Sequence, residues 1–160
     1  MATKHEHVST VNGFKVKKNG VETQVADVAV VDLTAAQIIA MYTTPVEVVP
    51  AKTGKAIIVD AVEFDMTRTS TAFTGGGVVA VQYDNTANGA GTATHATIAA
   101  TVVTGAAGET RTFRIPVVLS DIAASAIEGI GLYISNQTAV FAAGTGTARR
   151  SRAGCTAPGP

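Results

Sequence analysis

The chain has 160 residues, of which 46% are hydrophobic, and it carries 12 acidic and 12 basic residues. This length predicts one domain with appendages and a core of its own. The single cysteine, Cys155, excludes an intrachain disulfide, as expected for a chain assembled in a reducing cell. No apolar run reaches the ~18 residues of a membrane span, and the opening MATKHEHV lacks the apolar stretch of a secretory signal. We therefore expect a soluble protein made in the cytoplasm.

The balanced total charge hides a segregation along the chain. Residues 1–25 hold four lysines against two glutamates, a net charge of +2, and residues 149–160 hold three arginines and no acid, a net charge of +3. The part between them has five basic and ten acidic residues, a net charge of −5. Basic ends on an acidic body would steer attachment to an anionic surface or to a neighbouring subunit. The alternative is that both ends are solvated and have no role.

The first 24 residues are polar and lack a long apolar period, so we expect a flexible basic arm. Within this arm, residues 13–20 could form a small hairpin around Asn19-Gly20 when a partner holds it. Residues 25–33 alternate weakly between apolar and polar types, which predicts a first strand and the start of the folded domain.

A short capped helix follows in the segment LTAAQI. Thr34 is placed to cap it, with Gln37 as the reciprocal partner of a capping box. Leu33 and Ile38 are spaced for a hydrophobic staple. The helix must end before Pro45, because the residue preceding a proline is disfavoured in the helical region.

Strand patterns dominate the rest of the chain. Residues 46–49 are extended and closed by Pro50, and residues 55–66 alternate as one long half-buried strand. Further strands are predicted at residues 78–83, 92–103, 110–119 and 130–135, and a hairpin at residues 139–149. One helical turn is expected within residues 121–127, and turns at residues 67–77 and 84–91. Seven to nine short strands with only one or two brief helices predict an all-β fold, an antiparallel β-sandwich, with a jelly-roll-like topology preferred.

Four adjoining motifs carry a family resemblance: LTAAQI, TTPVEVVPA, GKAIIVDAV and TAFTGGG. Together they make residues 26–148 resemble the capsid decoration (cement or head) proteins of tailed bacteriophages, which are small β-sandwich virion proteins. The resemblance implies a non-enzymatic protein that binds the major capsid protein lattice on the exterior of the virion and stabilises it. It also implies a homotrimer, because such proteins commonly work at three-fold positions.

An alternative role remains open, since similar sequences also occur as tail or general structural proteins. The chain would then be a head-fibre or tail-associated module that binds the host cell surface. Its exposed loops at residues 67–77 and 84–91 would make the contact. Aromatic side chains, which stack on sugars, are scarce in these loops.

Candidate attachment residues to the capsid are Phe14, Lys15, Lys17 and Lys18, which lie together in the basic arm. The same lysines could contact nucleic acid phosphates. The acidic body would repel DNA, and interleaved aromatic residues are missing, so we expect no direct nucleic acid binding.

Other candidate sites have simpler interpretations. The segment from Asp84 starts like a calcium loop, but Thr86 and His95 stand where calcium ligands are required, so a hairpin turn is expected. Glu63 and Asp65, with Asp60 nearby, could hold a cation or act as an acid and base pair. The alternative, a solvated strand face, is preferred.

Nucleophilic and metal chemistry also lacks a complete set of residues. His95 has no GxSxG motif or activated cysteine near it in sequence, and His5 and His7 are two imidazoles on an arm expected to be mobile. Asn136 begins a glycosylation sequon, which matters only on a secretory route. We expect no catalytic residues, cofactor or metal.

The C-terminal end departs from the resembled family. A last apolar strand is expected after Ala148, but residues 149–160 are basic and contain proline. Either this is a natural tail or a shift of reading frame has replaced the strand. We expect a disordered tail that the fold of residues 26–148 does not need.

Overall fold

The structure is a computed structural model that describes residues 6–10, 13–18, 21–26, 28–94, 97–116, 123–150 and 155–156. Side chains are described for residues 28–94, 97–115, 123 and 125–149. None of the helices in these ranges is long and apolar enough to cross a bilayer.

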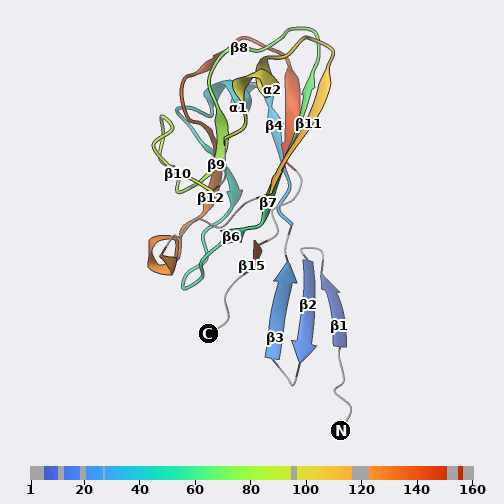
Figure 1. Cartoon of the computed structure of the whole chain (residues 1–160), viewed down its shortest axis with the longest axis vertical. Coiled ribbons are helices and arrows are strands. Elements are labelled where there is room, and N and C mark those ends of the chain that lie inside the picture. The colour runs from blue at the N-terminus through green and yellow to red at the C-terminus, as the bar shows by residue number, and fades with distance from the viewer. Residues whose placement is uncertain are drawn as a thin grey trace.

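Two four-stranded antiparallel sheets face each other and form the body of the molecule (Figure 1). The first, which we call the β9 sheet, has the order β10-β9-β12-β5, with β5 at Val46–Val49, β9 at Val79–Tyr83, β10 at Thr92–Ala93 and β12 at Leu132–Asn136. The second, the β7 sheet, has the order β11-β7-β14-β4, with β4 at Val31–Thr34, β7 at Ala61–Arg68, β11 at Thr110–Pro116 and β14 at Gly146–Arg150. The predicted all-β antiparallel fold is confirmed.

The eight strands of these sheets pair in a nested pattern. β4 pairs with β14, β5 with β12, β7 with β11 and β9 with β10, all antiparallel. Each strand of the first half of the body therefore meets a strand of the second half, in mirrored chain order, and the pairs alternate between the two sheets.

Both sheets bury their inner faces in one core. On β7, Val62, Phe64 and Met66 are fully buried and alternate with more exposed residues, as the period of a half-buried strand requires. The predicted strand at 55–66 is nevertheless two elements, because β6 (Ile58–Val59) is separated from β7 at Asp60. Ala56, Ile57 and Val59 are all buried, so the strict alternation predicted over residues 55–66 does not hold before Asp60.

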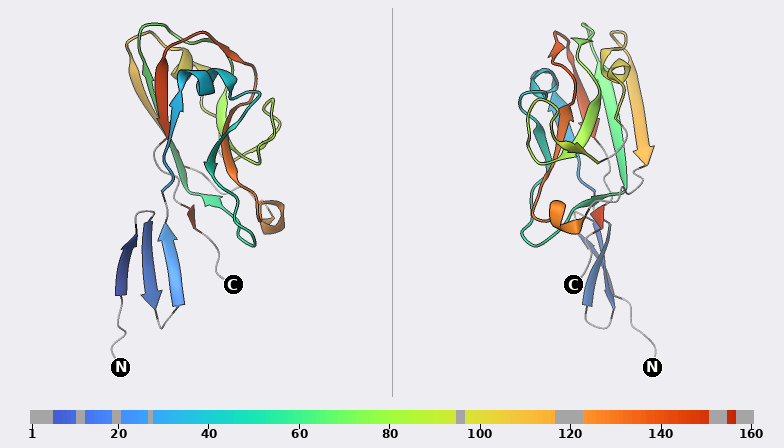
Figure 2. Two further views of the ribbon diagram at one scale, coloured as in Figure 1. Left: turned by 180° about the vertical axis from the view of Figure 1, so that it is seen from behind. Right: turned by 60° about the vertical axis from the view of Figure 1, so that its left-hand side comes forward.

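The capped helix is confirmed as α1 (Ala35–Ala40). The Thr34 hydroxyl accepts from the backbone N–H of Gln37 at 3.3 Å, and the Gln37 side-chain oxygen accepts from the N–H of Thr34 at 3.0 Å. Ile38 is buried against the core. The capping box thus sets the start of α1 and turns the chain from β4 toward β5 (Figure 2).

The predicted strand at 92–103 holds for β10 and for Ile98, which pairs with Val79 in an antiparallel bridge, but it is wrong from Ala100 on. Residues Ala100–Thr104 form a second helix, α2, in which the adjacent residues Val102 and Val103 are both buried. Consecutive side chains of a strand point to opposite faces, whereas neighbouring positions of a helix can share a broad apolar stripe. A 3-10 turn, η1 (Ala124–Ala126), lies within the predicted helical turn.

The predicted hairpin at 139–149 is also wrong. β13 (Phe141–Ala142) pairs with β8 (Thr74–Gly75), while β14 pairs with β7 and β4. Between β13 and β14, Ala143 has a φ of 44° and Gly144 a φ of 120°, so the chain turns away instead of folding back on itself.

Strands occupy part of both predicted appendages. β1 (Glu6–Thr10), β2 (Gly13–Lys18) and β3 (Val21–Ala26) form an antiparallel sheet. β2 pairs with β3, as the predicted hairpin requires, while its predicted turn at residues 19 and 20 lies outside the described residues. The strand predicted at 25–33 is divided between β3 and β4. β14 extends two residues past the predicted end of the body, and β15 (Cys155–Thr156) pairs with β6. The mobility of the arm and tail stays a prediction.

Candidate functional site

All four predicted attachment residues lie on β2, the central strand of the N-terminal sheet. Successive positions of a strand belong to opposite faces. Phe14 and Lys18 therefore share one face of the sheet, and Lys15 and Lys17 share the other. Lys17 is in register with Glu6 on β1 and with Glu22 on β3. The structure brings the four residues onto one strand but not onto one face.

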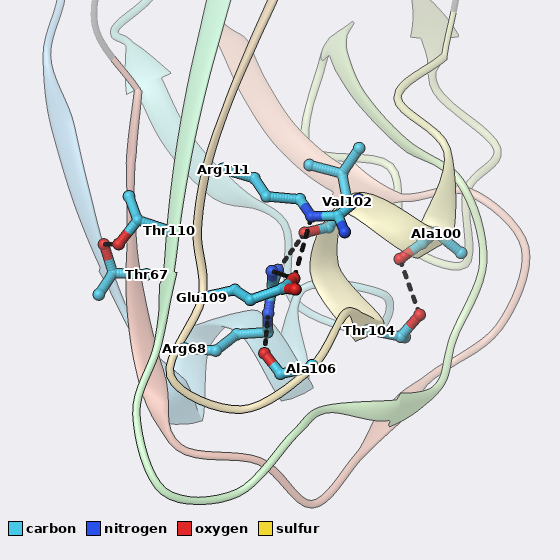
Figure 3. Close-up of polar contacts among 9 residues, drawn as sticks. All are labelled: Thr67, Arg68, Ala100, Val102, Thr104, Ala106, Glu109, Thr110 and Arg111. Carbon is cyan, nitrogen blue, oxygen red and sulfur yellow. Dashed lines mark hydrogen bonds and ion pairs between the residues drawn. The ribbon is translucent and has the colours of Figure 1, made fainter.

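The most buried charged group among the described side chains is Arg68, at the end of β7. Its Nε donates to the carbonyl oxygen of Ala106 at 2.9 Å, and its Nη1 donates to the carbonyl oxygen of Val102 (Figure 3). Its Nη2 lies 2.9 Å from Oε2 of Glu109. A guanidinium placed in this way satisfies one carbonyl in the last turn of α2, which the helix leaves unpaired, and one in the loop that follows.

The cluster around Arg68 is completed by the loop from α2 to β11. Arg111 donates to the same Glu109 oxygen at 3.1 Å, so one carboxylate bridges a buried and an exposed guanidinium. A Cβ added at Gly105 would lie 2.7 Å from Nη2 of Arg68, which explains a glycine at this position. The cluster fastens α2 and its following loop to the end of β7.

Sequence reasoning missed Arg68, although a signal was present. It continues the inward positions of β7 two residues after Met66, where an apolar residue is expected. A charged residue at a core position must have partners, so this break in the pattern points to a buried polar cluster.

The loop at residues 67–77, predicted as a possible contact surface, is fixed by hydrogen bonds to Thr145 and by the buried side chain of Phe73. The hydroxyl of Thr145 accepts from the backbone N–H groups of Ser70 at 3.1 Å and Thr71 at 2.9 Å. Phe73 is 1% exposed, and a Cβ at Gly144 would lie 2.4 Å from its ring. The loop is therefore anchored in the core, with its hydroxyl-bearing residues outside.

The loop at residues 84–91 is held by two glutamine amides. The buried Gln82 donates to the carbonyl oxygens of Asp84 at 3.1 Å and Thr86 at 2.8 Å, and Gln137 donates to Gly91 at 3.2 Å. Oδ1 of Asp84 accepts from the N–H of Asn85 at 2.7 Å. These contacts are those of an anchored turn. His95 lies outside the described residues.

The carboxylates of β7 lie on the outer face of the β7 sheet, opposite basic residues. Glu63 is in register with Arg114, and Asp65 with Arg149. Asp60 is exposed. In the part of the chain that the structure describes, no group of three or more His, Cys, Asp or Glu residues could hold a metal ion. Opposite charges directly across neighbouring strands attract each other, which favours the pairing of β7 with β11 and β14.

Two further polar groups lie on β12. The hydroxyl of Tyr133 donates to Oε1 of Glu47 at 3.1 Å, and the pKa of this phenol is raised by partial burial, by the hydrogen bond and by the nearby carboxylates. Asn136 is fully buried and its Oδ1 accepts from the N–H of Thr138 at 3.1 Å. In the folded chain the sequon at Asn136 is therefore inaccessible.

No protein-family model, curated protein or solved structure matches the chain. Its function is therefore inferred from the sequence and from the geometry described above.

Proposed function

We propose that the protein is a non-enzymatic virion structural protein, which decorates and stabilises a bacteriophage capsid by binding the major capsid protein lattice. It acts as a homotrimer on the capsid exterior after synthesis in the host cytoplasm. It uses no cofactor and contacts neither nucleic acid nor a membrane directly. This function rests on the resemblance of residues 26–148 to decoration proteins.

The nested strand pairing is the structural observation that carries the proposal. Four antiparallel pairs, wound so that successive pairs alternate between two sheets, are what a jelly roll requires, and jelly rolls are frequent in capsid domains. We propose this topology for the body. The polar clusters around Arg68, Gln82 and Thr145 all hold loops or helix ends, which supports a structural role.

Attachment is assigned to the N-terminal sheet and in particular to Phe14, Lys15, Lys17 and Lys18. A segment of positive net charge attached to an acidic body favours contact with an anionic surface. Modest affinity per copy is sufficient, because many copies bind side by side on a repeating lattice.

Imaging of virions that carry this chain tests the proposal directly. We expect its density on the outer surface of the head, over the major capsid protein. Density confined to the tail or to fibres would reject decoration and favour the host-surface role.

A binding assay then tests the attachment segment. The intact chain and a chain lacking residues 1–24 are mixed with capsids that lack this protein, and occupancy is measured after sedimentation. We expect the truncated chain to keep the melting temperature of its body and to lose most of its occupancy. Equal occupancy of the two chains would remove the attachment role of residues 1–24.

A further inference from the structure

The tip of the loop at residues 84–91 is a tight turn whose two central residues are Asn88 and Gly89. The backbone N–H of Ala90 donates to the carbonyl oxygen of Ala87 at 3.3 Å, which closes the turn. Asn88 has a φ of 60° and Gly89 a φ of 69°, the combination of a type I′ turn. Asparagine and glycine adopt positive φ more readily than other residues, so the turn favours the pair found here.

Packing makes the glycine of this pair obligatory. A Cβ added at Gly89 would lie 2.4 Å from the Cα of Gln137, so any side chain at this position would collide with backbone. Asn88 is fixed as well, because its backbone N–H donates to the carbonyl oxygen of Tyr42 at 2.6 Å. The fold therefore holds an Asn-Gly pair at the tip of the loop.

An Asn-Gly pair is chemically labile, because glycine leaves the backbone nitrogen that follows the asparagine unhindered. The nitrogen of Gly89 can attack Cγ of Asn88: a C–N bond forms, and the amide nitrogen leaves as ammonia with the proton that the attacking nitrogen loses. Water then opens the cyclic imide. Opening at the side-chain carbonyl gives aspartate, whereas opening at the backbone carbonyl gives isoaspartate, in which the main chain runs through Cβ and Cγ and is longer by one methylene group.

The surroundings of Asn88 leave it open to this reaction. Its side chain is exposed. Within the described residues the N–H of Gly89 donates to no acceptor, so the attacking nitrogen gives up no hydrogen bond. Of the other asparagines with described side chains, Asn136 is fully buried, and Asn85 precedes a threonine, whose side chain shields the nitrogen.

We propose that Asn88 is a site of spontaneous conversion to isoaspartate, and that the conversion releases the loop at residues 84–91 from its anchors. The imide ring brings Cβ, Cα and the carbonyl carbon of Asn88 nearly into one plane with the nitrogen of Gly89. A type I′ turn does not have this geometry, so the turn must open before the ring can close, and the folded chain reacts slowly.

The product no longer fits the turn. With a longer backbone, residue 88 does not restore both its own bond to Tyr42 and the bond from Ala90 to Ala87. The charge of a new carboxylate is added close to Asp84, which is also exposed. The age of each molecule is thereby recorded in the state of this loop, whatever the function of the protein.

Ageing of the full chain tests the inference. The parent protein carries Asn12→Gly and Asn19→Gly, which remove the two other Asn-Gly pairs of the sequence. The control also carries Asn88→Gly, which tolerates the positive φ and has no amide to react. After incubation in warm, mildly alkaline buffer, peptide mapping by mass spectrometry should find isoaspartate at residue 88 of the parent and none in the control. The parent should react at least roughly tenfold faster when unfolded in urea, because the two hydrogen bonds of the folded turn are then absent.

Hydrogen exchange over residues 84–91 measures the release of the loop. Aged parent protein should exchange faster in this segment than fresh parent protein, whereas the control should not change with age. Fresh Asn88→Asp has the charge of the product without its longer backbone and should exchange like the fresh parent. Absence of isoaspartate at residue 88, equal rates in the folded and unfolded chain, or unchanged exchange after conversion would each overturn the inference. Fast exchange in fresh Asn88→Asp would overturn it too, since charge alone would then release the loop.

Discussion

Two pairs of arginine and carboxylate in the β7 sheet have the same chemistry and very different surroundings. The Arg68 side chain is 0% exposed and its Nη2 is 2.9 Å from Glu109, while the Arg149 side chain is 63% exposed and its Nε is 3.6 Å from Asp32. Arg68 also binds two backbone carbonyls. Burial and the number of partners, more than charge, thus separate a pair that organises the fold from one that lies on its surface.

The physical reason is the cost of leaving water. A buried guanidinium without partners is strongly unfavourable, so each contact of Arg68 is required once the side chain is enclosed. An exposed pair exchanges hydration for a weak, salt-screened attraction and gains little.

The largest effect is expected from Arg68→Met, which keeps the length of the side chain and removes all its donors. The carbonyls of Val102 and Ala106 lose their bonds, and the free energy of unfolding should fall by roughly 3 kcal/mol. Urea denaturation measures this. Arg111→Met is the matched control on the exposed side of Glu109 and should cost less than about 0.5 kcal/mol. Equal losses in the two variants would refute the distinction.

A smaller effect, on the order of 1 kcal/mol, is expected from Gly105→Ala, because the added Cβ would stand 2.7 Å from the fixed guanidinium of Arg68. The same substitution in an Arg68→Met background should cost less, since the crowding group is gone. A double-mutant cycle by urea denaturation gives this coupling. Additive losses would show that the guanidinium moves aside freely.

Arg149→Met should change the free energy of unfolding by at most about 0.5 kcal/mol, since the pair with Asp32 is exposed. The small difference should vanish in high salt, which screens exposed charges. Asp32→Asn is the companion variant and should behave alike. A loss as large as that of Arg68→Met would mean that the end of β14 depends on this pair.

The smallest effect concerns the pair of Tyr133, which is half-buried, and Glu47, which is exposed. Burial, the hydrogen bond to Glu47 and the carboxylates raise the phenol pKa above its ordinary 10.0 in the folded chain. The folded state therefore holds this proton more tightly than the unfolded state. Its contribution to stability is complete below pH 10.0 and is lost as the pH rises through the raised pKa.

Ultraviolet titration of tyrosinate, compared with that of Tyr133→Phe, isolates this group. Glu47→Gln should lower the pKa of Tyr133 toward its ordinary value, because it removes a nearby negative charge. An unchanged titration in Glu47→Gln would mean that burial and the charge of Asp84, and not Glu47, raise the pKa of Tyr133.

Local patterns in the sequence predicted several elements correctly. The capping box at Thr34 and Gln37, the alternation of Val62, Phe64 and Met66, and the antiparallel pairing of β2 with β3 each depend on neighbours a few positions apart. Segments in which apolar and polar residues alternate only weakly led to wrong predictions of secondary structure. Ala- and Thr-rich residues 92–103 alternate without strong apolar contrast, and there the packing of Val102 and Val103 decided in favour of α2.

The candidate sites divide in the same way. The sequence alone shows four candidate attachment residues in one segment: Phe14, Lys15, Lys17 and Lys18. Their separation into two faces follows from the pairing of β2 with β1 and β3. The only sign of the buried Arg68 in the sequence is that a charged residue takes an inward position of β7, where an apolar residue is expected.

By itself the sequence determined the all-β class, the capped helix and the segregation of charge, because these follow from composition and from spacings within one element. The tertiary structure alone decided that β13 pairs with β8 instead of β14, and that Arg68 reaches Val102, Ala106 and Glu109. These contacts join residues more than thirty positions apart. Which distant strand or carbonyl is in reach depends on how both sheets close around their common core.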